Sequence, residues 1–411
     1  MIPVSQALAQ VLEVTAVLRA ERVGLAAAAG RVVAEDVVSG RTVPAAPNSA
    51  MDGWAVRHAD VASAPTTLRV IGEAPAGPAR DHRVEPRTAI KIFTGSVVPA
   101  GADTVVRVEY STTRADAVVI EQAEPLGANI RLAGEDIEQG AVVLAGGTLI
   151  GPADVGVLAS VGRSAVVVHR RPRVAILSTG AELVEVDETP GPGQVVNSNA
   201  WVLAAAATEA GADATVWPIV RDRFEDIRDH LADAATADVV LSTGGVSVGD
   251  YDFVNDALAA VGVERVFWRV AQKPGKPLSF GRRGPHLFFG LPGNPVSALV
   301  CFYVYVRPAL RKLGGHRRLH LPMVQARLAV DTRKAKDLTE FVRVRLDAAA
   351  DGLVATPFTS QSSGVLTSLG AGASLLVGPA AARTLTAGTR YPVLVATPET
   401  LARTDSGSFL D

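Results

Sequence analysis

The sequence predicts a multidomain protein of mixed α/β and β class: a central three-layer αβα domain, a small β-rich domain, an extended mixed N-terminal domain and a C-terminal β-barrel. The first observation is length, because 411 residues exceed what one hydrophobic core usually serves. The second is that residues 171–314 alternate apolar strands with helical segments, which predicts a mostly parallel sheet covered on both faces. The third is that residues 41–129 and 318–411 consist of short β-like runs divided by turn residues.

The predicted N-terminal domain is discontinuous along the chain. Residues 1–40 contain an amphipathic segment, for which Ser5 is a candidate helix cap, followed by the alternating run RVVAEDVVS. Residues 130–170 are again of mixed pattern, and we expect them to pair with residues 1–40. The residues between them, 41–129, form the small β-rich domain, with runs such as TTLRVIGEA and TAIKIFTG.

Residues 171–314 show the clearest alternation of strands and helices. VAILS and ADVVLSTGG are continuous apolar strands; a helix follows Asn199, and a second helix lies in DRFEDIRDHLADA. Asp222, with Glu225 three residues later, predicts a capping box for that second helix. Parallel sheets of this kind bind ligands beyond the carboxyl ends of their strands. Residues 318–411 are again β-like and predict a small barrel.

Composition and charge exclude several classes of protein. Hydrophobic residues make up 48% and charged residues 20%, which is typical of a globular chain. A net charge of −2 provides no general field for nucleic acid or an anionic membrane. Cys301, the only cysteine, lies in an apolar run, so it excludes a disulfide framework and a cysteine-cluster zinc site and is read as a buried small hydrophobe. Without a signal peptide or a run of about 18 apolar residues, we expect a cytoplasmic protein.

Two predicted strands end in the same small polar residues. Glycine lets a ligand phosphate approach the main chain, and hydroxyls and free amides donate hydrogen bonds to oxyanions. A third element, LPGNP, places Asn294 as a helix cap and Pro295 at the first helical position, at the same edge of the sheet. Each element alone is equally consistent with a simple turn, but the three together predict an anion-binding edge. Its residues are Ser178, Thr179, Gly180, Ser242, Thr243, Gly244, Gly245, Pro292, Gly293 and Asn294.

Charged residues near this edge suggest how an anion is held. Lys273 and Lys276 lie on the proline-stiffened loop QKPGKP, which favours binding of a polyanion, although a solvated loop remains the alternative. Carboxylates at Glu182, Asp250 and Asp252 would repel phosphate unless a divalent cation lay between them, and Mg²⁺ is the cation that bridges such groups. Asp252 is equally a candidate cap for the helix that follows it.

Further polar clusters lie outside the parallel-sheet domain. Asp52 is displayed on the stiff loop PNSAMDGW, where a turn aspartate is the alternative interpretation. Thr94 lies in KIFTGSVVPAGAD, and Arg131 and Asp136 lie in NIRLAGEDI. The sequence contains no Walker phosphate loop, dinucleotide fingerprint, zinc-protease histidine pair or nucleophile elbow.

Taken in order, the motifs resemble those of the molybdopterin molybdenumtransferase family, the MoeA proteins and the E domain of gephyrin. The resemblance is nearly full-length and is carried by PAAPNSAMDGWAV, FTGSVVPAGAD, NIRLAGEDI, LSTGAELVE, GQVVNSN, LSTGGVSVGDYDFV, QKPGKPLSFG and LPGNPVSALVCF. Ala181 departs from the family's more frequent aspartate, and Leu132 and Ala133 replace a more basic run. STGG and PGNP are also shared with the related adenylyltransferase domain.

The resemblance implies a fold, a reaction and a set of site residues. It implies four domains, an elongated homodimer with its active site at the subunit boundary, and magnesium-dependent reaction of adenylyl-molybdopterin with molybdate to give molybdenum cofactor and AMP. Asp252 and Glu182 would hold Mg²⁺, and Asp52 would act from the partner subunit. The other residues implied by motif position are Thr94, Asp136, Lys273 and Lys276, with Arg343 and Ser363 aligned loosely in FVRVRL and TSQSSG.

Two other functions remain open at this point. An ATP-dependent molybdopterin adenylyltransferase needs only the parallel-sheet domain, so the flanking regions argue against it. A non-catalytic pterin-binding scaffold has no need of the carboxylates and lysines. For the enzyme, the expected macromolecular partners are the adenylyltransferase and molybdoenzymes, and neither nucleic acid nor membrane.

Overall fold

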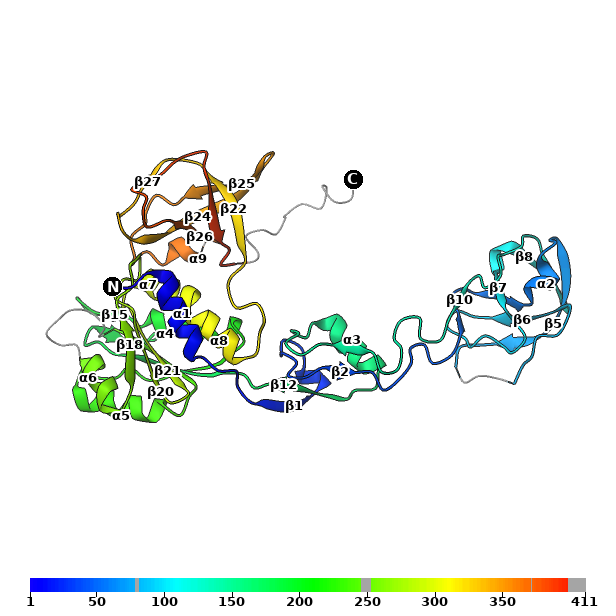
Figure 1. Ribbon diagram of the computed structural model, residues 1–411, viewed down its shortest axis with the longest axis horizontal. Coiled ribbons are helices and arrows are strands. Elements are labelled where there is room, and N and C mark those ends of the chain that lie inside the picture. Colours follow the sequence, from blue (N-terminus) through cyan, green and yellow to red (C-terminus); the bar gives the residue numbers. More distant parts are fainter. Residues whose placement is uncertain (78–80, 245–252, 371, 398–411) are drawn as a thin grey trace.

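The structure is a computed structural model that describes residues 1–77, 81–244, 253–370 and 372–397. Three of the predicted site residues, Gly245, Asp250 and Asp252, lie outside the described residues. The chain is elongated: a large body at one end joins through an extended middle region to a small β-sheet region at the other (Figure 1). Within one chain, the loops of the small sheet are therefore remote from the parallel sheet.

The large body is built on a six-stranded sheet with the order β16-β13-β17-β21-β20-β18. Neighbours from β16 to β21 pair in parallel, and β20 pairs antiparallel with both β21 and β18. This is the mostly parallel sheet that the sequence predicts. The strands are β13 (Arg173–Ser178), β16 (Asp213–Val216), β17 (Val239–Thr243), β18 (Glu264–Trp268), β20 (Ser279–Arg283) and β21 (His286–Leu291).

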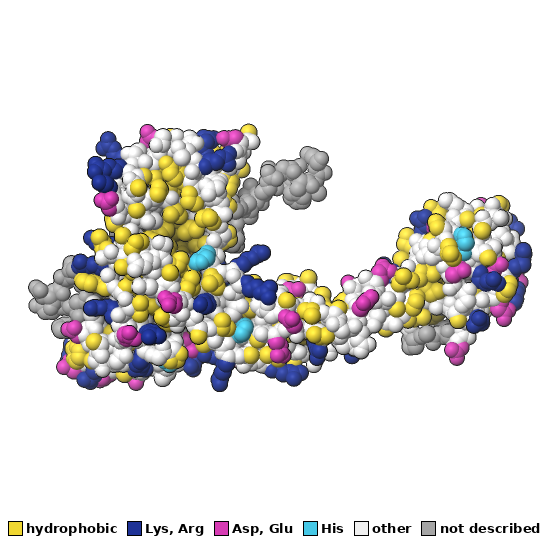
Figure 2. Space-filling view, viewed as in Figure 1, with side chains coloured by type: hydrophobic (Ala, Val, Ile, Leu, Met, Phe, Trp, Pro, Cys, Tyr) yellow, Lys and Arg dark blue, Asp and Glu magenta, His cyan; other side chains and the backbone are white. Residues whose placement is uncertain are grey.

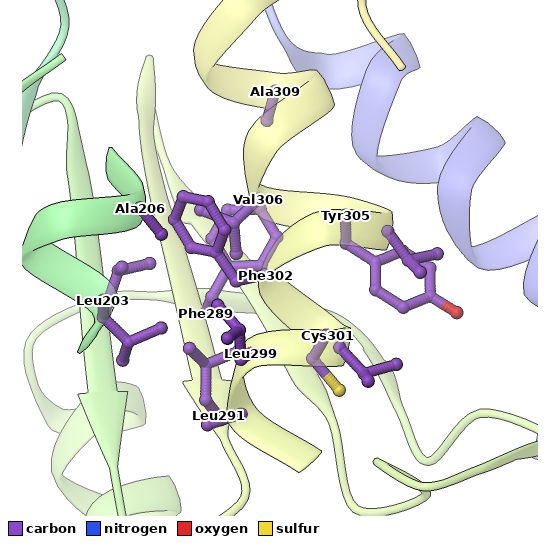
Figure 3. Close-up of a cluster of buried hydrophobic side chains, with 14 of the residues drawn as sticks. Leu203, Ala206, Phe289, Leu291, Leu299, Cys301, Phe302, Tyr305, Val306 and Ala309 are labelled. Carbon is purple, nitrogen blue, oxygen red and sulfur yellow. The ribbon is translucent and has the colours of Figure 1, made fainter. Parts of the chain in front are cut away.

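Helices cover both faces of this sheet and give the predicted three layers. Alternate residues of β13 pack on opposite faces, with Val174 and Ile176 in one core and Ala175 and Leu177 in the other. Figure 3 shows part of the larger core. The first face carries α1 (Val4–Val14), α4 (Ser198–Glu209), α7 (Pro295–Cys301), the π-helical η3 (Phe302–Val306) and α8 (Arg307–Leu313). The second face carries α5 (Phe224–Ala234) and α6 (Phe253–Ala260).

Helix starts differ from the prediction at three places. The helix predicted after Asn199 is α4, which begins at Ser198 with Asn197 as its cap. The residue before α1 is Pro3, and Ser5 lies inside the helix, so Ser5 is not its cap. Similarly, α5 begins at Phe224 after Arg223 and has no side-chain cap, so the predicted capping box of Asp222 and Glu225 does not form. The predicted start is confirmed for α7, which has Asn294 at the N-cap position and Pro295 as its first residue, but the Asn294 side chain makes no capping hydrogen bond.

The middle region brings together two distant stretches of sequence. β1 (Ala20–Gly24) pairs antiparallel with β12 (Ala165–His169), and β2 (Val37–Val38) pairs with β11 (Val142–Leu144). The helix α3 (Pro152–Ser160) and the short η1 (Leu25–Ala27) pack on them around a core that includes Leu158. Although α1 also belongs to the first forty residues, it packs with Ala7 and Val11 in the parallel-sheet core instead. The remaining boundaries of the four domains stay a prediction.

The small β-rich region is a second six-stranded sheet, with the order β7-β4-β6-β5-β9-β8. It is joined to the middle region by β3 (Asn48–Ser49), which pairs with β10 (Ile130–Arg131). The short α2 (His58–Val61) and η2 (Val108–Tyr110) lie beside the sheet. Its strands are β4 (Gly53–Val56), β5 (Thr66–Ala74), β6 (Thr88–Ile92), β7 (Thr104–Arg107), β8 (Ser111–Arg114) and β9 (Ala117–Ile120).

The C-terminal region forms the predicted barrel, which has five strands. It closes because β24 pairs with both β25 and β26. β19 (Gln272–Lys273) joins the outside of the barrel by parallel pairing with β24, so the lysine loop of the large body is tied to it. The barrel strands are β22 (Met323–Leu328), β24 (Thr339–Ala349), β25 (Gly352–Pro357), β26 (Ser374–Gly378) and β28 (Arg390–Leu394). The minor elements here are β23 (Thr332–Arg333), β27 (Thr384–Leu385) and α9 (Thr367–Gly370).

The molecular surface in Figure 2 carries Lys and Arg side chains that are spread among acidic ones rather than gathered in one patch on this face. This distribution agrees with the net charge of −2. Among the described residues, no helix combines the length and apolar character needed to cross a membrane.

Candidate active site

Three neighbouring strands of the parallel sheet end in register. Ser178 is paired with Thr243, and Thr243 with Leu291, so the residues that follow these strands meet at one edge. The Ser178 Oγ and Thr243 Oγ1 atoms lie 3.0 Å apart. Gly244 has a φ of 89°, and a Cβ there would lie 2.4 Å from the Thr179 carbonyl oxygen. The glycine therefore allows two strand ends to approach each other closely.

A cavity of about 610 Å³ opens at this edge. Its wall includes seven of the predicted residues: Thr179, Glu182, Thr243, Gly244, Pro292, Gly293 and Asn294. Ser178 and Ser242 are buried and do not line it, and Gly180 lies between Thr179 and Glu182 without lining it. The structure thus brings the predicted strand ends together, with the two serines placed behind the cavity wall. β14 (Leu183–Val184) and β15 (Val195–Val196), which pair in parallel, form another part of the wall.

Sequence reasoning missed a group of residues at the start of α4. Asn197, Ser198 and Asn199 line the cavity. Asn199 Nδ2 donates a hydrogen bond of 2.7 Å to the Gly293 carbonyl, which ties this helix to the LPGNP loop. Asn197 Oδ1 accepts from the Ala200 amide as a helix cap. Three polar residues at a helix start that follows a strand were the available signal.

Asp222 lies near the first cavity, although its sequence position predicts a helix cap. Because the capping box does not form, its carboxylate is free to approach the strand ends, and Thr179 Oγ1 donates to Asp222 Oδ1 at 3.4 Å. This contact places an exposed carboxylate beside the wall of the first cavity.

A second cavity of about 480 Å³ adjoins the first, because Pro277 lines both. The four predicted residues Lys273, Lys276, Arg343 and Ser363 meet here. Asn294 Nδ2 donates to Ser363 Oγ at 2.9 Å, which connects the two cavity walls. Both lysines are exposed, and Lys273 Nζ lies 3.1 Å from Oε1 of the buried Glu340.

Arg343 is a cation buried at the wall of the second cavity. It is 1% exposed, and its guanidinium donates to the carbonyls of Ser362 and Ser360 at 2.9 and 3.1 Å. Burial lowers the pKa of Arg343. No carboxylate among the described residues forms an ion pair with it. A buried cation held only by neutral groups favours binding of an anion in the adjacent cavity.

The first cavity has limited metal-binding capacity on the described residues. Those residues contain no group of three His, Cys, Asp or Glu side chains placed to hold a metal. Glu182 is the only carboxylate among the residues that line the cavity within the described ranges. Further oxygen ligands would come from Asp250 or Asp252, outside these ranges, or from the hydroxyls of Thr179 and Thr243.

Asp52 and Thr94 contact each other on loops of the small β region. That region, labelled by β5, β6 and β7, forms the far end of the molecule (Figure 1). Asp52 precedes β4 and Thr94 follows β6, and these strands are antiparallel neighbours in which Gly53 pairs with Ile92. Thr94 donates its backbone amide and its hydroxyl to Asp52 Oδ1. These two hydrogen bonds, the backbone bond first, hold the pKa of the exposed Asp52 carboxylate below its usual value.

Arg131 and Asp136 line a third cavity, of about 460 Å³, at the base of the small sheet. Arg131 is paired with Asn48 across β10 and β3, and Asn48 also lines this cavity. Ser49, the next residue, accepts a hydrogen bond from the Gly95 amide, so the loop of Thr94 lies close by. Leu132, which stands in place of a more basic residue, is 64% exposed. Asp52, Thr94, Arg131 and Asp136 therefore share one region, remote from the first two cavities of the same chain (Figure 1).

Comparisons with known proteins cover nearly the whole chain. Three family models match: the MoeA N-terminal region (domain I and II) over residues 2–162, a probable molybdopterin binding domain over 175–312, and the MoeA C-terminal region (domain IV) over 325–396. A molybdopterin molybdenumtransferase from Nostoc sp. is 42% identical over 303 residues, which are 72% of this chain and 70% of the relative. Molybdopterin molybdenumtransferase 2 from Mycobacterium tuberculosis is 38% identical over 358 residues, which are 84% of this chain and 87% of the relative.

The fold agrees with a crystal structure from this group. The molybdopterin biosynthesis MoeA protein of Pyrococcus horikoshii superposes with a TM-score of 0.83 at 30% sequence identity, over 96% of this chain and 100% of the other. With matched models along the chain, relatives of at least 38% identity and this agreement in fold, the chain belongs to the MoeA family of molybdopterin molybdenumtransferases.

Proposed function

We propose that this chain is a molybdopterin molybdenumtransferase, which inserts molybdate into adenylyl-molybdopterin and releases AMP to form molybdenum cofactor. The observation that carries the proposal is the pair of adjoining cavities that share Pro277. One offers hydroxyls, amides and glycine backbone, and the other offers three cationic side chains. The relatives are named molybdopterin molybdenumtransferases, which supports transfer of molybdenum to molybdopterin.

The first cavity suits the adenylyl and pterin phosphates. Thr179 and Thr243 provide neutral donors at the strand ends, and α4 begins at the cavity with Ser198, where free backbone amides favour anions. At about 610 Å³, the cavity falls within the range of pockets that hold ligands of nucleotide size.

The second cavity suits molybdate, a compact dianion with four oxygens. Lys276 provides mobile positive charge, the buried Arg343 provides fixed positive charge, and Ser363 provides a hydroxyl. Glu340 also lines this cavity, and Lys273 offsets its negative charge through their 3.1 Å ion pair. Because the cavities adjoin, an oxyanion here would lie beside a pterin bound in the first cavity. Placement of both reactants in one geometry contributes much of the rate enhancement in such reactions.

We assign Mg²⁺ to Glu182 together with Asp252. Carboxylate oxygens and nearby hydroxyls are ligands that this cation prefers, and Glu182 lines the first cavity. When bound there, the cation would neutralise charge on the phosphoryl oxygens. Lys273 and Lys276 would compensate the remaining negative charge, and the backbone around Gly244 would orient the phosphate.

A complete site requires a second copy of the chain. Asp52 and Thr94 are remote from the first two cavities of their own chain (Figure 1), so we propose a homodimer in which the small β region of one subunit covers these cavities of its partner. Exposed apolar residues occur on both surfaces: Met51 and Leu132 near Asp52, and Val186, Val195 and Trp201 near the first cavity. Contact between these two surfaces would bury the exposed apolar side chains.

In this arrangement Asp52 acts as an ionised carboxylate. Thr94 occupies Oδ1 with two hydrogen bonds and lowers the pKa of Asp52, so the group stays ionised and can orient an attacking oxygen or, as a weak base, accept its proton. Attack of a water oxygen at the adenylyl phosphorus, with one proton of that water passing to Asp52, would break the phosphoanhydride bond. The molybdopterin phosphate would be the leaving group, and the adenylyl group would be released as AMP with the water oxygen in its phosphate. Arg131 and Asp136, in the cavity next to this loop, would contact the far end of the substrate.

A single-turnover assay tests the proposal. Purified protein mixed with adenylyl-molybdopterin, molybdate and Mg²⁺ should release AMP and yield molybdenum cofactor in equal amounts. Formation of adenylyl-molybdopterin from ATP and molybdopterin would support the adenylyltransferase alternative, and binding without AMP release would support a scaffold. As partners we propose the adenylyltransferase that supplies the substrate and molybdoenzymes that receive the product, and as compartment the cytoplasm.

A further inference from the structure

A buried hydrogen-bonded network lies directly beneath the lysine loop. Gln272, Cys301 and Tyr305 are each 0% exposed. Gln272 and Gly275 line the second cavity, and Cys301 and Tyr305 contact Gln272 from behind it. We propose that Tyr305 and Gln272 are positioning residues that hold Lys273 and Lys276 in the geometry needed to bind molybdate. The inference rests on the proposed function.

The direction of the hydrogen bonds supports this role. The Tyr305 hydroxyl donates to Gln272 Oε1 in a short hydrogen bond, which fixes the orientation of the buried amide. Gln272 Nε2 then donates to the carbonyls of Pro274 at 3.0 Å and Gly275 at 3.3 Å. The amide thus holds the middle of the loop between Lys273 and Lys276. If the amide turned over, its oxygen would face these two carbonyl oxygens, which is unfavourable in a buried site.

The backbone at this loop has little freedom to move. Gly275 has a φ of 92°, and a Cβ there would lie 2.5 Å from Cys301 Sγ and 2.6 Å from Gln272 Nε2. Cys301 Sγ itself lies 3.5 Å from the Gly275 carbonyl. The lysine loop therefore packs against the helix that carries Cys301 at Gly275, where there is no room for a side chain.

The helix reaches the loop through an irregular turn. Tyr305 lies in the π-helical segment η3, between α7 and α8. Figure 3 shows Cys301 and Tyr305 extending from one side of this helix, while Phe302 lies on the side of Phe289 and Ala206. A π-helical turn changes which side chains share a face, and such turns occur frequently at functional sites. Here the π-helical turn lets side chains from one helix contact both the core of the sheet and the lysine loop.

The test compares Tyr305→Phe with Tyr303→Phe. Tyr303 is a neighbour in the same π-helical segment that is only partly buried, and it provides the matched control. We expect Tyr305→Phe to weaken molybdate binding roughly tenfold, as measured by calorimetry. A tenfold loss of affinity corresponds to the free energy of about one lost hydrogen bond. Binding of AMP, which belongs to the first cavity, should not change. Tyr303→Phe should bind both ligands like the original chain.

A second comparison separates positioning from stability. Tyr305→Phe leaves Gln272 Oε1 buried without a donor, so it should also lower the melting temperature. Gln272→Met removes the Nε2 donor to the Pro274 and Gly275 carbonyls, so it should weaken molybdate binding at least as much as Tyr305→Phe. The double variant should bind molybdate no more weakly than Gln272→Met alone, because both residues act through the same loop. Unchanged molybdate affinity in either single variant, or loss of AMP and molybdate binding in parallel, would overturn the inference. If the original chain binds neither molybdate nor AMP, the proposed function fails instead.

Discussion

Thr94 donates two hydrogen bonds to a single carboxylate oxygen of Asp52, one from its backbone amide at 2.7 Å and one from its hydroxyl at 2.9 Å. Both groups lie on loops that follow or precede adjacent strands, so the contact depends on the pairing of β4 with β6. The hydrogen bonds favour the ionised form and lower the pKa of Asp52. Asp52 Oδ2 takes no part in these two hydrogen bonds.

Removal of the hydroxyl should change the pH dependence of the reaction. In Thr94→Val the backbone donor remains, but the pKa of Asp52 should rise toward its ordinary value. If the ionised Asp52 carboxylate is the active form, as we propose, the acidic limb of the rate profile should move to higher pH, and Thr94→Ser should leave it in place. If Thr94→Val and the original chain give the same pH–rate profile, Asp52 does not control the rate.

The proposed magnesium ligands should be dispensable for folding. Glu182 is exposed at the edge of the first cavity, so Glu182→Gln should retain its melting temperature within a few degrees but lose Mg²⁺-dependent AMP release. Asp252→Ala should behave in the same way. Asp187→Asn, an exposed change nearby, is the control and should remain active. Normal turnover of Glu182→Gln would contradict this metal assignment.

The two lysines should differ in their effects. Either Lys273→Ala or Lys276→Ala should weaken molybdate and adenylyl-molybdopterin binding by roughly 10- to 100-fold, as for a lost charge-assisted hydrogen bond. Only Lys273→Ala should also lower stability, since it leaves the buried Glu340 without its 3.1 Å ion pair. Lys336→Ala on the barrel surface is the control. Unchanged affinity by calorimetry in both variants would exclude the second cavity as the anion site.

The close approach at Gly244 should make that position intolerant of a side chain. Gly244→Ala adds a Cβ that would lie 2.4 Å from the Thr179 carbonyl oxygen, at a φ of 89°. We expect a loss of about 2 kcal/mol or more in the free energy of unfolding, measured in urea. Gly293→Ala, in the wall of the same cavity but with no neighbour within 4 Å, should cost much less. Equal effects would mean that the strand ends are not closely packed.

Local pattern predicted much of this molecule, but contacts between distant segments were harder to predict. The strand ends at Ser178 and Thr243 were predictable, because parallel strands bring their carboxyl ends to one edge. Asp222 was misassigned, since a D-x-x-E spacing indicates a cap only if the helix begins at the next residue, and α5 begins one residue later. The hydrogen bond between Tyr305 and Gln272 spans 33 positions and depends on a π-helical turn, for which the sequence offers no periodic signal.

Subunit mixing tests most directly whether the active site is built from two chains. Asp52→Ala and Glu182→Ala should each be inactive alone, because every site of either homodimer lacks one carboxylate. After random exchange, half of the dimers are mixed, and each has one site with both groups intact, so about a quarter of all sites should recover AMP release. If AMP release does not recover after subunit exchange has been verified, the shared site is contradicted, and both carboxylates act within one chain.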